Sequence, residues 1–205
     1  YPASITKVLS VLTALQYAKM SDTVVFSEDS ISFLQWDDAQ IGMKPGEEIS
    51  MESALYGMLL ASANEVSYAV AENVGKQYLN GGYAEFIEEM NRISQELGCT
   101  SSNWVNANGL HDDNHYTTAH DMARIAAAAY QNEEFRRLET TLEYKVPPTN
   151  LTAEERILDQ NHKMLWPENY YYYANAKAGK TGYTDQSKTT LVTMAEGNDM
   201  QLAAV

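Results

Sequence analysis

The sequence predicts a mixed α/β fold (α+β), in which a helix-rich middle is flanked by the two parts of an α/β lobe. Apolar residues recur with helical spacing in several segments between residues 8 and 129. The run 23–26 is rich in β-branched residues and predicts a strand. The segments 189–196 and 200–205 surround the turn Gly197-Asn198-Asp199, which is typical of a β-hairpin.

Composition indicates one globular domain. The chain has 205 residues, of which 44% are hydrophobic and 20% are charged, so we expect residues 1–205 to form a single domain of one or two lobes. The formal net charge of −14 argues against nucleic-acid binding, because phosphate recognition needs a basic surface. No apolar run reaches the roughly 18 residues that a membrane-spanning helix needs.

Capping residues predict where the first two helices of the middle segment begin and end. Ser50 is an N-cap candidate before the run 54–61, which is apolar nearly all round and is therefore predicted to be buried. The next helix is predicted to run from about Glu65 to near Gly75, because glycine commonly follows a helix C-terminus.

The later elements are predicted in the same way. Residues 83–97 have helical period and end at Gly98, and Thr118 with Asp121 resembles a capping box that opens another helix. Residues 141–146 are a strand candidate that ends at two prolines. The four tyrosines 170–173 are expected to be partly buried in the core, with a cleft wall as the alternative.

The segment Tyr1-Pro2-Ala3-Ser4-Ile5-Thr6-Lys7 places a serine and a lysine three residues apart, before the apolar-periodic run 8–15. The run predicts a helix with Ser4 in its first turn, so Ser4 and Lys7 share one face. A serine hydroxyl needs a nearby base to become a nucleophile, and lysine is such a base when burial and positive charge lower its pKa. The alternative is an exposed turn with a solvated lysine, since two fixed positions often match by chance.

Two further motifs follow, Ser62-Ala63-Asn64 and Lys180-Thr181-Gly182. The first lies on a predicted turn between two helices, where a hydroxyl can relay a proton and an amide can bind a substrate carbonyl. The alternative is that Ser62 and Asn64 only cap the next helix. The second motif is predicted to open the strand 189–195, with a plain loop as the alternative. Another pattern of such sites, Tyr-x-Asn, occurs at residues 78–80, 130–132 and 173–175, and none of these lies between two buried helices.

With these three motifs in this order, the chain resembles the penicillin-binding D-alanyl-D-alanine carboxypeptidases of low molecular mass, serine peptidases that trim peptidoglycan stem peptides. The segments 106–123 and 161–166 also resemble that family, so the resemblance covers nearly the whole chain. It implies a β-lactamase/transpeptidase-like fold of two lobes, a helical lobe and an antiparallel sheet.

The resemblance also implies a role for each motif residue. Ser4 would be the acylated nucleophile and Lys7 its general base. Ser62 would pass the proton toward the leaving D-alanine, and Asn64 would orient the substrate amide and Lys7. Lys180 would add positive potential that helps to keep Lys7 neutral.

The last motif would bind the substrate through Lys180, Thr181, Gly182 and Tyr183, with Thr181 in contact with the terminal carboxylate. The backbone N–H groups of Ser4 and Tyr183 would form the oxyanion hole, which usually contributes about 10²–10³ in rate per donor. The resemblance implies no cofactor and no metal.

The family pattern implies that this chain is part of a longer protein. The family's sheet includes strands before the nucleophile helix and one that would follow residue 205, so the catalytic domain is expected to be incomplete at both ends. Residues 185–188 replace a small Ala-Gly pair that many relatives carry.

The implied partners are a stem peptide ending in D-Ala-D-Ala and β-lactam antibiotics, which would be covalent inhibitors. The implied location is extracytoplasmic, either secreted or on the outer face of the bacterial membrane, with membrane association only through segments outside this chain.

Three alternatives stay open. A serine β-lactamase shares the acylation apparatus, but its commonest class adds a Glu-x-x-x-Asn segment that this sequence lacks. A penicillin sensor, acylated without turnover, would need the same serine and lysine. A metal site at His111, His115 and His120, beside Asp112, Asp113 and Asp121, is a weaker alternative to structural hydrogen bonds.

Overall fold

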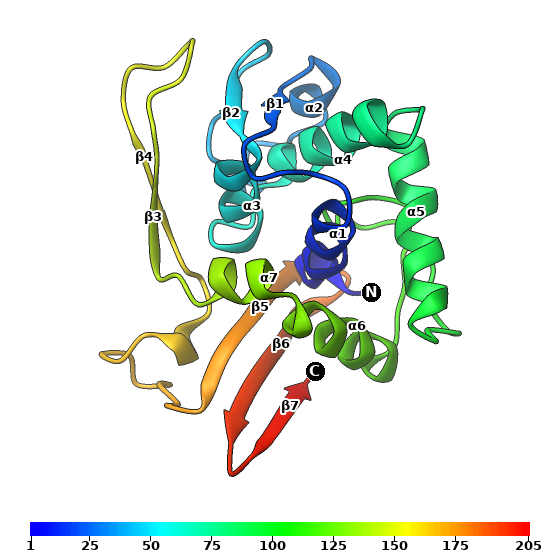
Figure 1. Cartoon of the computed structure of the whole chain (residues 1–205), viewed down its shortest axis with the longest axis vertical. Helices are drawn as coiled ribbons and strands as arrows, with labels where there is room; N and C mark the ends of the chain where they lie inside the picture. The colour runs from blue at the N-terminus through cyan, green and yellow to red at the C-terminus, as the bar shows by residue number, and fades with distance from the viewer.

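A helical part and a smaller part built on an antiparallel sheet make up the computed structural model, which describes residues 1–205 (Figure 1). The helical elements are η1 (Ala3–Ile5), α1 (Thr6–Leu15), α2 (Asp29–Ser32), α3 (Met51–Leu59), α4 (Asn64–Tyr78), α5 (Tyr83–Glu96), α6 (Ala119–Gln131), α7 (Glu133–Glu139) and η2 (Lys163–Leu165). The strands are β1 (Thr23–Val25), β2 (Glu48–Ser50), β3 (Glu143–Val146), β4 (Arg156–Asp159), β5 (Ala176–Thr184), β6 (Lys188–Gly197) and β7 (Met200–Ala204). No helix is long and apolar enough to span a membrane.

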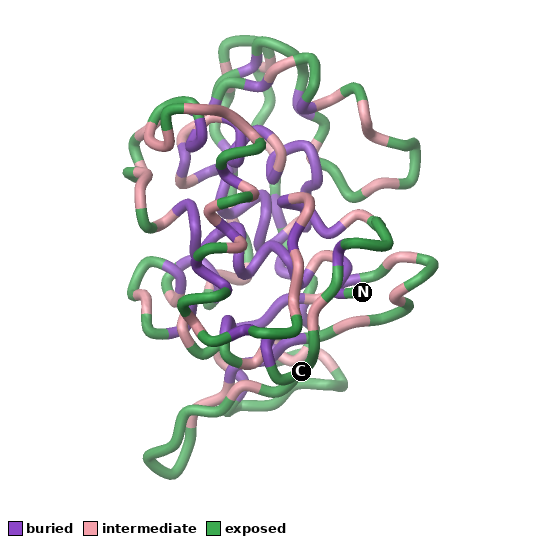
Figure 2. Tube along the Cα trace, turned by 90° about the vertical axis from the view of Figure 1, so that its right-hand side faces the viewer, coloured by how far each residue is buried: buried purple, intermediate pink, exposed green.

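Helix α1 lies at the centre of the helical part and is buried along almost its whole length (Figure 1). It packs against α3, α4, α5, α6 and α7, and its apolar residues join a cluster of 41 buried hydrophobic side chains. The cluster continues into the sheet at Ala178 and Val192, and the buried segments run through the middle of the molecule (Figure 2). The turn η1 and the start of α1, which carry Ser4 and Lys7, are therefore held between the two parts.

The main sheet has the order β5-β6-β7, and all its pairs are antiparallel. The predicted C-terminal hairpin is confirmed, and its turn residues Asn198 and Asp199 have φ values of 53° and 59°, as a two-residue turn of this type requires. The prediction for Lys180-Thr181-Gly182 was wrong in detail. These residues lie inside a strand of their own, β5, in which Lys180 pairs with Val192. Pairing with β6 holds this glycine-containing segment extended despite its weak strand propensity.

Strands β3 and β4 form a hairpin beside β1 and β2 (Figure 1). A buried ion pair attaches it, because Arg156 Nη2 lies 2.8 Å from Glu47 Oε1 and the Glu47 side chain is fully buried. The strand predicted at 141–146 is confirmed as β3. The strands β2 and β4 and the helices α2 and α7 are short and carry no pattern that predicts them from the sequence.

The predicted helix caps are largely confirmed. The Ser50 side chain accepts the Ser53 N–H at the start of α3, and Gly98 has φ +78° just after α5. The Thr118 side chain caps α6 by accepting the Asp121 N–H. The capping box is not completed, because the Asp121 carboxylate instead accepts the Ser101 N–H and the Ser102 hydroxyl.

Gly75 does not end a helix, contrary to the prediction, because α4 continues to Tyr78. The glycine serves close packing, since a Cβ atom at position 75 would lie 1.8 Å from the backbone oxygen of Gly82. The absence of a side chain lets the loop after α4 fold back onto the helix.

The tyrosines 170–173 are exposed, with 44% to 95% of their surface accessible, so the expected partial burial in the core was wrong. They do not line the main cleft either. They lie in the turn-rich segment between η2 and β5.

Candidate active site

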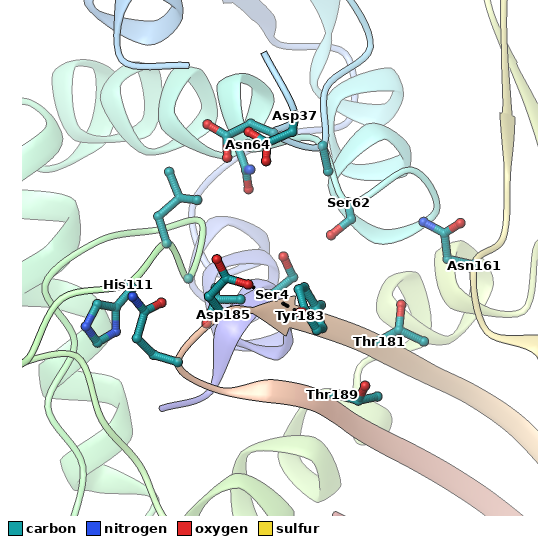
Figure 3. Close-up of a pocket in the computed structure, with 17 residues that line it drawn as sticks. Ser4, Asp37, Ser62, Asn64, His111, Asn161, Thr181, Tyr183, Asp185 and Thr189 are labelled. Carbon is teal, nitrogen blue, oxygen red and sulfur yellow. Dashed lines mark hydrogen bonds between the residues drawn. The ribbon is translucent and has the colours of Figure 1, made fainter. Parts of the chain in front are cut away.

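A cleft of about 670 Å³ opens between the helical part and the β5–β6 hairpin (Figure 3). Six of the predicted site residues line it, namely Ser4, Ser62, Asn64, Thr181, Gly182 and Tyr183. The other two, Lys7 and Lys180, are at most 1% exposed and lie beneath its surface. The structure therefore brings together residues from the beginning, the middle and the end of the chain.

Ser4 lies in the 3-10 turn η1, which leads directly into α1. The turn is unusual because Ala3, which precedes the serine, has φ +52°. Gly109 makes room for it, since a Cβ atom there would lie 1.9 Å from the Ala3 oxygen. A buried hydrogen bond of 2.9 Å between Thr6 Oγ1 and His115 Nε2 ties the start of α1 to the loop that contains Gly109.

The side-chain nitrogen of Lys7 has three close neighbours. Nζ lies 2.9 Å from Ser4 Oγ, 2.8 Å from Asn64 Oδ1 and 2.6 Å from the backbone oxygen of Asn108. The last two atoms only accept hydrogen bonds, whereas a serine hydroxyl can also donate one. A neutral amine fits this arrangement, because its two N–H groups satisfy the carbonyl oxygens and its lone pair faces the Ser4 hydroxyl.

Electrostatics favour the neutral amine as well. Burial, and then the positive charge of Lys180, lower the pKa of Lys7 well below the ordinary value of a lysine. The carboxylates of Glu65 and Asp38 oppose this shift without reversing it. The site thus holds a lysine that can accept a proton from the adjacent serine.

Ser62 is held in a left-handed backbone conformation, with φ +62°, between α3 and α4. Its Oγ accepts a hydrogen bond of 3.0 Å from Lys180 Nζ, which also donates to the backbone oxygen of Thr181 at 2.8 Å. Neither Ser62 nor Asn64 caps α4 with its side chain, because the N-cap is Ala63. Both side chains are thus free to point into the site, and the capping alternative does not describe them.

Strand β5 approaches the start of α1 closely at Gly182. A Cβ atom at this position would lie 2.8 Å from the backbone nitrogen of Ser4, so only glycine fits. The next residue, Tyr183, is 62% exposed at the cleft rim, and its hydroxyl donates to Asp185 Oδ1 at 3.3 Å (Figure 3). The backbone N–H groups of Ser4 and Tyr183 therefore lie in segments that are in contact.

His115, one of the histidines considered as metal ligands, forms hydrogen bonds within the protein instead. His115 Nδ1 accepts the Val105 N–H at 3.1 Å, so its Nε2 carries the hydrogen and donates to Thr6. Burial lowers the pKa of His115 to about 4, so the ring is neutral at pH 7. His111 and His120 each lie beside one aspartate, and no group of three or more His, Cys, Asp or Glu side chains is arranged to hold a metal ion.

Several cleft residues were not predicted from the sequence. Asp37, Asp38, His111, Asn161 and Gln186 also line it. Asp37 and Asp38 lie on a loop without a recognisable motif, so only the packing of that loop reveals them. His111 and Asn161 lie in segments that resemble the family, and Gln186 lies in the segment 185–188, but no role in the cleft was predicted for any of the three. The loop that carries Asp37 and Asp38 is tied to α4, because the Asn64 N–H donates to Ala39 O at 2.8 Å and the Ile41 N–H donates to Glu65 Oε1 at 2.7 Å. None of the three Tyr-x-Asn segments contributes to the cleft.

Comparisons with known proteins give a consistent result. A family model described as D-alanyl-D-alanine carboxypeptidase matches residues 1–205. The chain is 30% identical over 213 residues to the D-alanyl-D-alanine carboxypeptidase DacF of Bacillus subtilis, covering 100% of this chain and 50% of that protein. It is 28% identical over 212 residues to DacA of Haemophilus influenzae, again with 50% of that protein covered. The chain thus spans about half the length of these curated relatives.

Solved structures extend the comparison to the fold. A D-alanyl-D-alanine carboxypeptidase from Mycobacterium tuberculosis superposes with a TM-score of 0.84 at 29% identity, covering 98% of this chain and 71% of that one. The Streptomyces K15 DD-transpeptidase gives a TM-score of 0.86 at 22% identity, with 99% and 78% covered, and shares the fold. The expected penicillin-binding type of fold, with a helical lobe and an antiparallel sheet, is confirmed.

Proposed function

Because the chain belongs to the D-alanyl-D-alanine carboxypeptidase family, we propose that it is the catalytic part of a serine peptidase that removes the terminal D-alanine from peptidoglycan stem peptides. The observation that carries the proposal is the buried Lys7 amine, 2.9 Å from Ser4 Oγ and within hydrogen-bond distance of two carbonyl oxygens. A serine activated in this way attacks carbonyl carbons.

The reaction begins when Ser4 Oγ attacks the carbonyl carbon of the penultimate D-alanine and its proton moves to Lys7 Nζ. The oxyanion that forms is stabilised by the N–H groups of Ser4 and Tyr183. The carbon–nitrogen bond then breaks, and the leaving nitrogen takes, through the Ser62 hydroxyl, the proton that Lys7 had accepted. Water finally hydrolyses the ester on Ser4 and releases the shortened peptide.

Charged and polar groups around the serine support these assignments. Lys180 donates to Ser62 Oγ and lowers the pKa of Lys7, so it assists both the proton relay and the base. Asn64 holds Lys7 through its side-chain oxygen. Thr181 and Gly182 line the cleft where the terminal carboxylate of the substrate would lie. The mechanism needs no metal and no cofactor.

The proposal extends to partners and location. β-Lactam antibiotics resemble the D-Ala-D-Ala terminus and would acylate Ser4 covalently. The stem peptide lies outside the cytoplasm, so the protein would act there, secreted or held at the outer face of the membrane by segments outside residues 1–205. Residues 1–205 would form part of one catalytic domain. Nucleic acids are not expected partners, given the net charge of −14.

Mass spectrometry with benzylpenicillin tests the proposal. The full-length protein should gain one antibiotic mass and hold it for minutes or longer, because no Glu-x-x-x-Asn glutamate is present to activate water from another side. The Ser4→Ala variant should gain nothing. The unmodified protein should also release D-alanine from an acyl-D-Ala-D-Ala peptide.

The same experiment separates the alternative functions. Rapid turnover of penicillin without an accumulating adduct would assign the protein as a β-lactamase. A stable adduct without any release of D-alanine would assign it as a penicillin sensor. Absence of both an adduct and D-alanine release would refute the acyl-enzyme on Ser4.

A further inference from the structure

The walls of the cleft carry acidic side chains without any basic side chain to match them. Asp37, Asp38 and Asp185 line it, whereas no lysine or arginine does. None of the three aspartates takes part in an ion pair within the protein. The two lysines of the site lie beneath the surface, next to Ser4 and Ser62. The three carboxylates are therefore available to a cation that enters the cleft.

The aspartates lie at one end of the cleft. Strand β5 passes the nucleophile Ser4 at Gly182, where a Cβ atom would lie 2.8 Å from the Ser4 nitrogen. Thr181, beside the buried Lys180, comes before this point, and Asp185 follows the last residue of the strand. Figure 3 shows Thr181 and Asp185 on opposite sides of Ser4. With the terminal carboxylate of the substrate at Thr181, the acyl part of the peptide would extend past Ser4 toward Asp185.

The opposite wall presents the other two carboxylates on a fixed loop. Two hydrogen bonds hold this loop against the start of α4. Asp38 Oδ2 accepts the Gln35 N–H at 2.8 Å, which leaves its Oδ1 free, and the Asp37 side chain is exposed and forms no hydrogen bond within the protein. Figure 3 places Asp37 on this helical wall, across the cleft from Asp185. A side chain that enters this end of the cleft therefore meets carboxylates on both walls.

A buried amide on the same wall indicates how the peptide is held there. Asn64 is only 4% exposed and lines the cleft, and its Oδ1 accepts the hydrogen bond from Lys7. Its Nδ2 donates to no group of the protein, so it is free to donate to a backbone carbonyl of a bound peptide. An extended peptide advances about 3.3–3.6 Å per residue, so the residue before the two D-alanines lies within a few residue lengths of Ser4. Its side chain then reaches the acidic end of the cleft.

We propose that Asp37, Asp38 and Asp185 are specificity-determining residues that select peptides whose residue before D-Ala-D-Ala carries a free, positively charged amino group on its side chain. The inference rests on the proposed function and deepens it, because it names the class of substrate. A cationic side chain is attracted to three carboxylates that have no other partner, whereas an acidic side chain is repelled. A side-chain amine that has been acylated has lost its charge, so the cleft selects against such a peptide.

Release of D-alanine from matched peptides by the full-length protein tests the proposal. The probes are Nα-acetyl-L-lysyl-D-Ala-D-Ala, its Nε-acetylated derivative, and the peptide with L-glutamate in place of L-lysine. We expect kcat/KM for the free amine to exceed that for the acetylated amine about five- to tenfold, as two or three partly exposed ion pairs imply, and to be lowest for glutamate. The preference should shrink in ~1 M salt, which screens exposed charges.

Variants of the aspartates identify the residues responsible. The readout is the ratio of kcat/KM for the free amine to that for the acetylated amine, because a loss of folded protein or of the catalytic base affects both peptides equally. The ratio should fall to about one or two in the Asp37→Asn/Asp38→Asn variant and by about half in Asp185→Asn. The matched control is Glu154→Gln, an exposed residue between β3 and β4 and outside the cleft, which should keep the wild-type ratio.

Two results would overturn the proposal. One is an equal kcat/KM of the wild type for the charged and the uncharged peptide, and the other is a wild-type ratio in both the double variant and Asp185→Asn. Release of D-alanine from all three peptides at the same rate would refute only the role of the aspartates and leave the proposed function standing. Failure to release D-alanine from any peptide would refute the proposed function, and this inference with it.

Discussion

The side-chain nitrogen of Lys7 lies 2.9 Å from the hydroxyl oxygen of Ser4, and the Lys7 side chain is fully buried. The two atoms belong to consecutive turns, η1 and α1, which are packed between the helical part and the sheet. The distance is short enough for direct proton transfer. Because burial lowers the pKa of Lys7, its neutral amine can accept the proton of the Ser4 hydroxyl.

Replacing Lys7 should slow acylation of Ser4 strongly. In the Lys7→Ala variant the serine loses its nearby base, and we expect the rate of acylation by benzylpenicillin to fall about 10²–10⁴-fold. The Lys7→Arg variant should not restore the rate, because arginine cannot deprotonate in proteins. Intact-protein mass spectrometry against time measures both. The exposed Lys76 offers the matched control, since Lys76→Ala should acylate at the wild-type rate. A Lys7→Arg variant as fast as the wild type would mean that the base is elsewhere.

Acylation should depend on pH through the proton of Lys7. Burial lowers the pKa of Lys7, so the neutral amine that accepts the serine proton persists to a lower pH than in an ordinary lysine. The rate should therefore fall as the pH drops through this lowered pKa, because the protonated amine has no free lone pair. Second-order rate constants measured between acid and alkaline pH give the profile. A rate that keeps rising toward pH ~10, the ordinary titration range of lysine, would contradict this expectation.

Adding one methyl group at Gly75 should destabilise the protein. A Cβ atom at this position would lie 1.8 Å from the Gly82 oxygen, so the loop must move, and overpacking of this kind costs about 1–3 kcal/mol. Gly57, in α3, is the matched control. Its Cβ would meet side-chain carbons at 3.4 Å or more, so Gly57→Ala should be neutral or add up to ~1 kcal/mol through helix propensity. Urea unfolding compares the two, and equal stabilities would show that α4 tolerates a shift of the loop.

Removing Arg156 should weaken the attachment of the β3–β4 hairpin. Arg156→Ala leaves Glu47 buried without its ion-pair partner, which typically costs ~3–5 kcal/mol. The control is Arg92→Ala, because Arg92 is about half exposed and its pairs with Glu89 and Glu96 should contribute less than ~1 kcal/mol. Thermal unfolding distinguishes the two variants, and similar midpoints would rule out a stabilising role for the buried pair.

The ion pair also has a pH signature. Burial alone would raise the pKa of Glu47, but hydrogen bonds from Thr149 and Arg156 lower it overall. Its contribution to stability is therefore present above the unfolded pKa of about 4.3 and is lost as the pH falls through the lower folded value. The difference in the free energy of unfolding between the wild type and the Arg156→Ala variant should therefore become smaller in that acid range.

The sequence predicted the elements that rest on strong local signals. The apolar periods of α1 and α3, the caps at Ser50 and Thr118, and the C-terminal turn all depend on neighbouring residues, so they could be read directly. Gly75 could not, because its role depends on Gly82 approaching from outside the helix. The exposed tyrosines 170–173 show the reverse case, since aromatic side chains usually indicate burial but no element covers these.

The residues of the candidate site also divide into those that a local sequence motif identifies and those that only tertiary packing brings to the site. Ser4, Lys7, Ser62, Asn64 and Lys180 belong to motifs of fixed spacing, and the structure brings them together. The backbone oxygen of Asn108, which holds Lys7, has no side-chain signature at all.

The two buried lysines at the centre of the site imply a conflict between activity and the stability of the folded protein. Folding must withdraw two amines from water into one small region, and the work required opposes the native state. An uncharged side chain of similar length, as in Lys7→Met, would remove one of these desolvation costs but would leave the buried oxygens of Asn64 and Asn108 without their donor. The amine that the reaction needs is therefore also part of the hydrogen bonding that holds the centre of the molecule together.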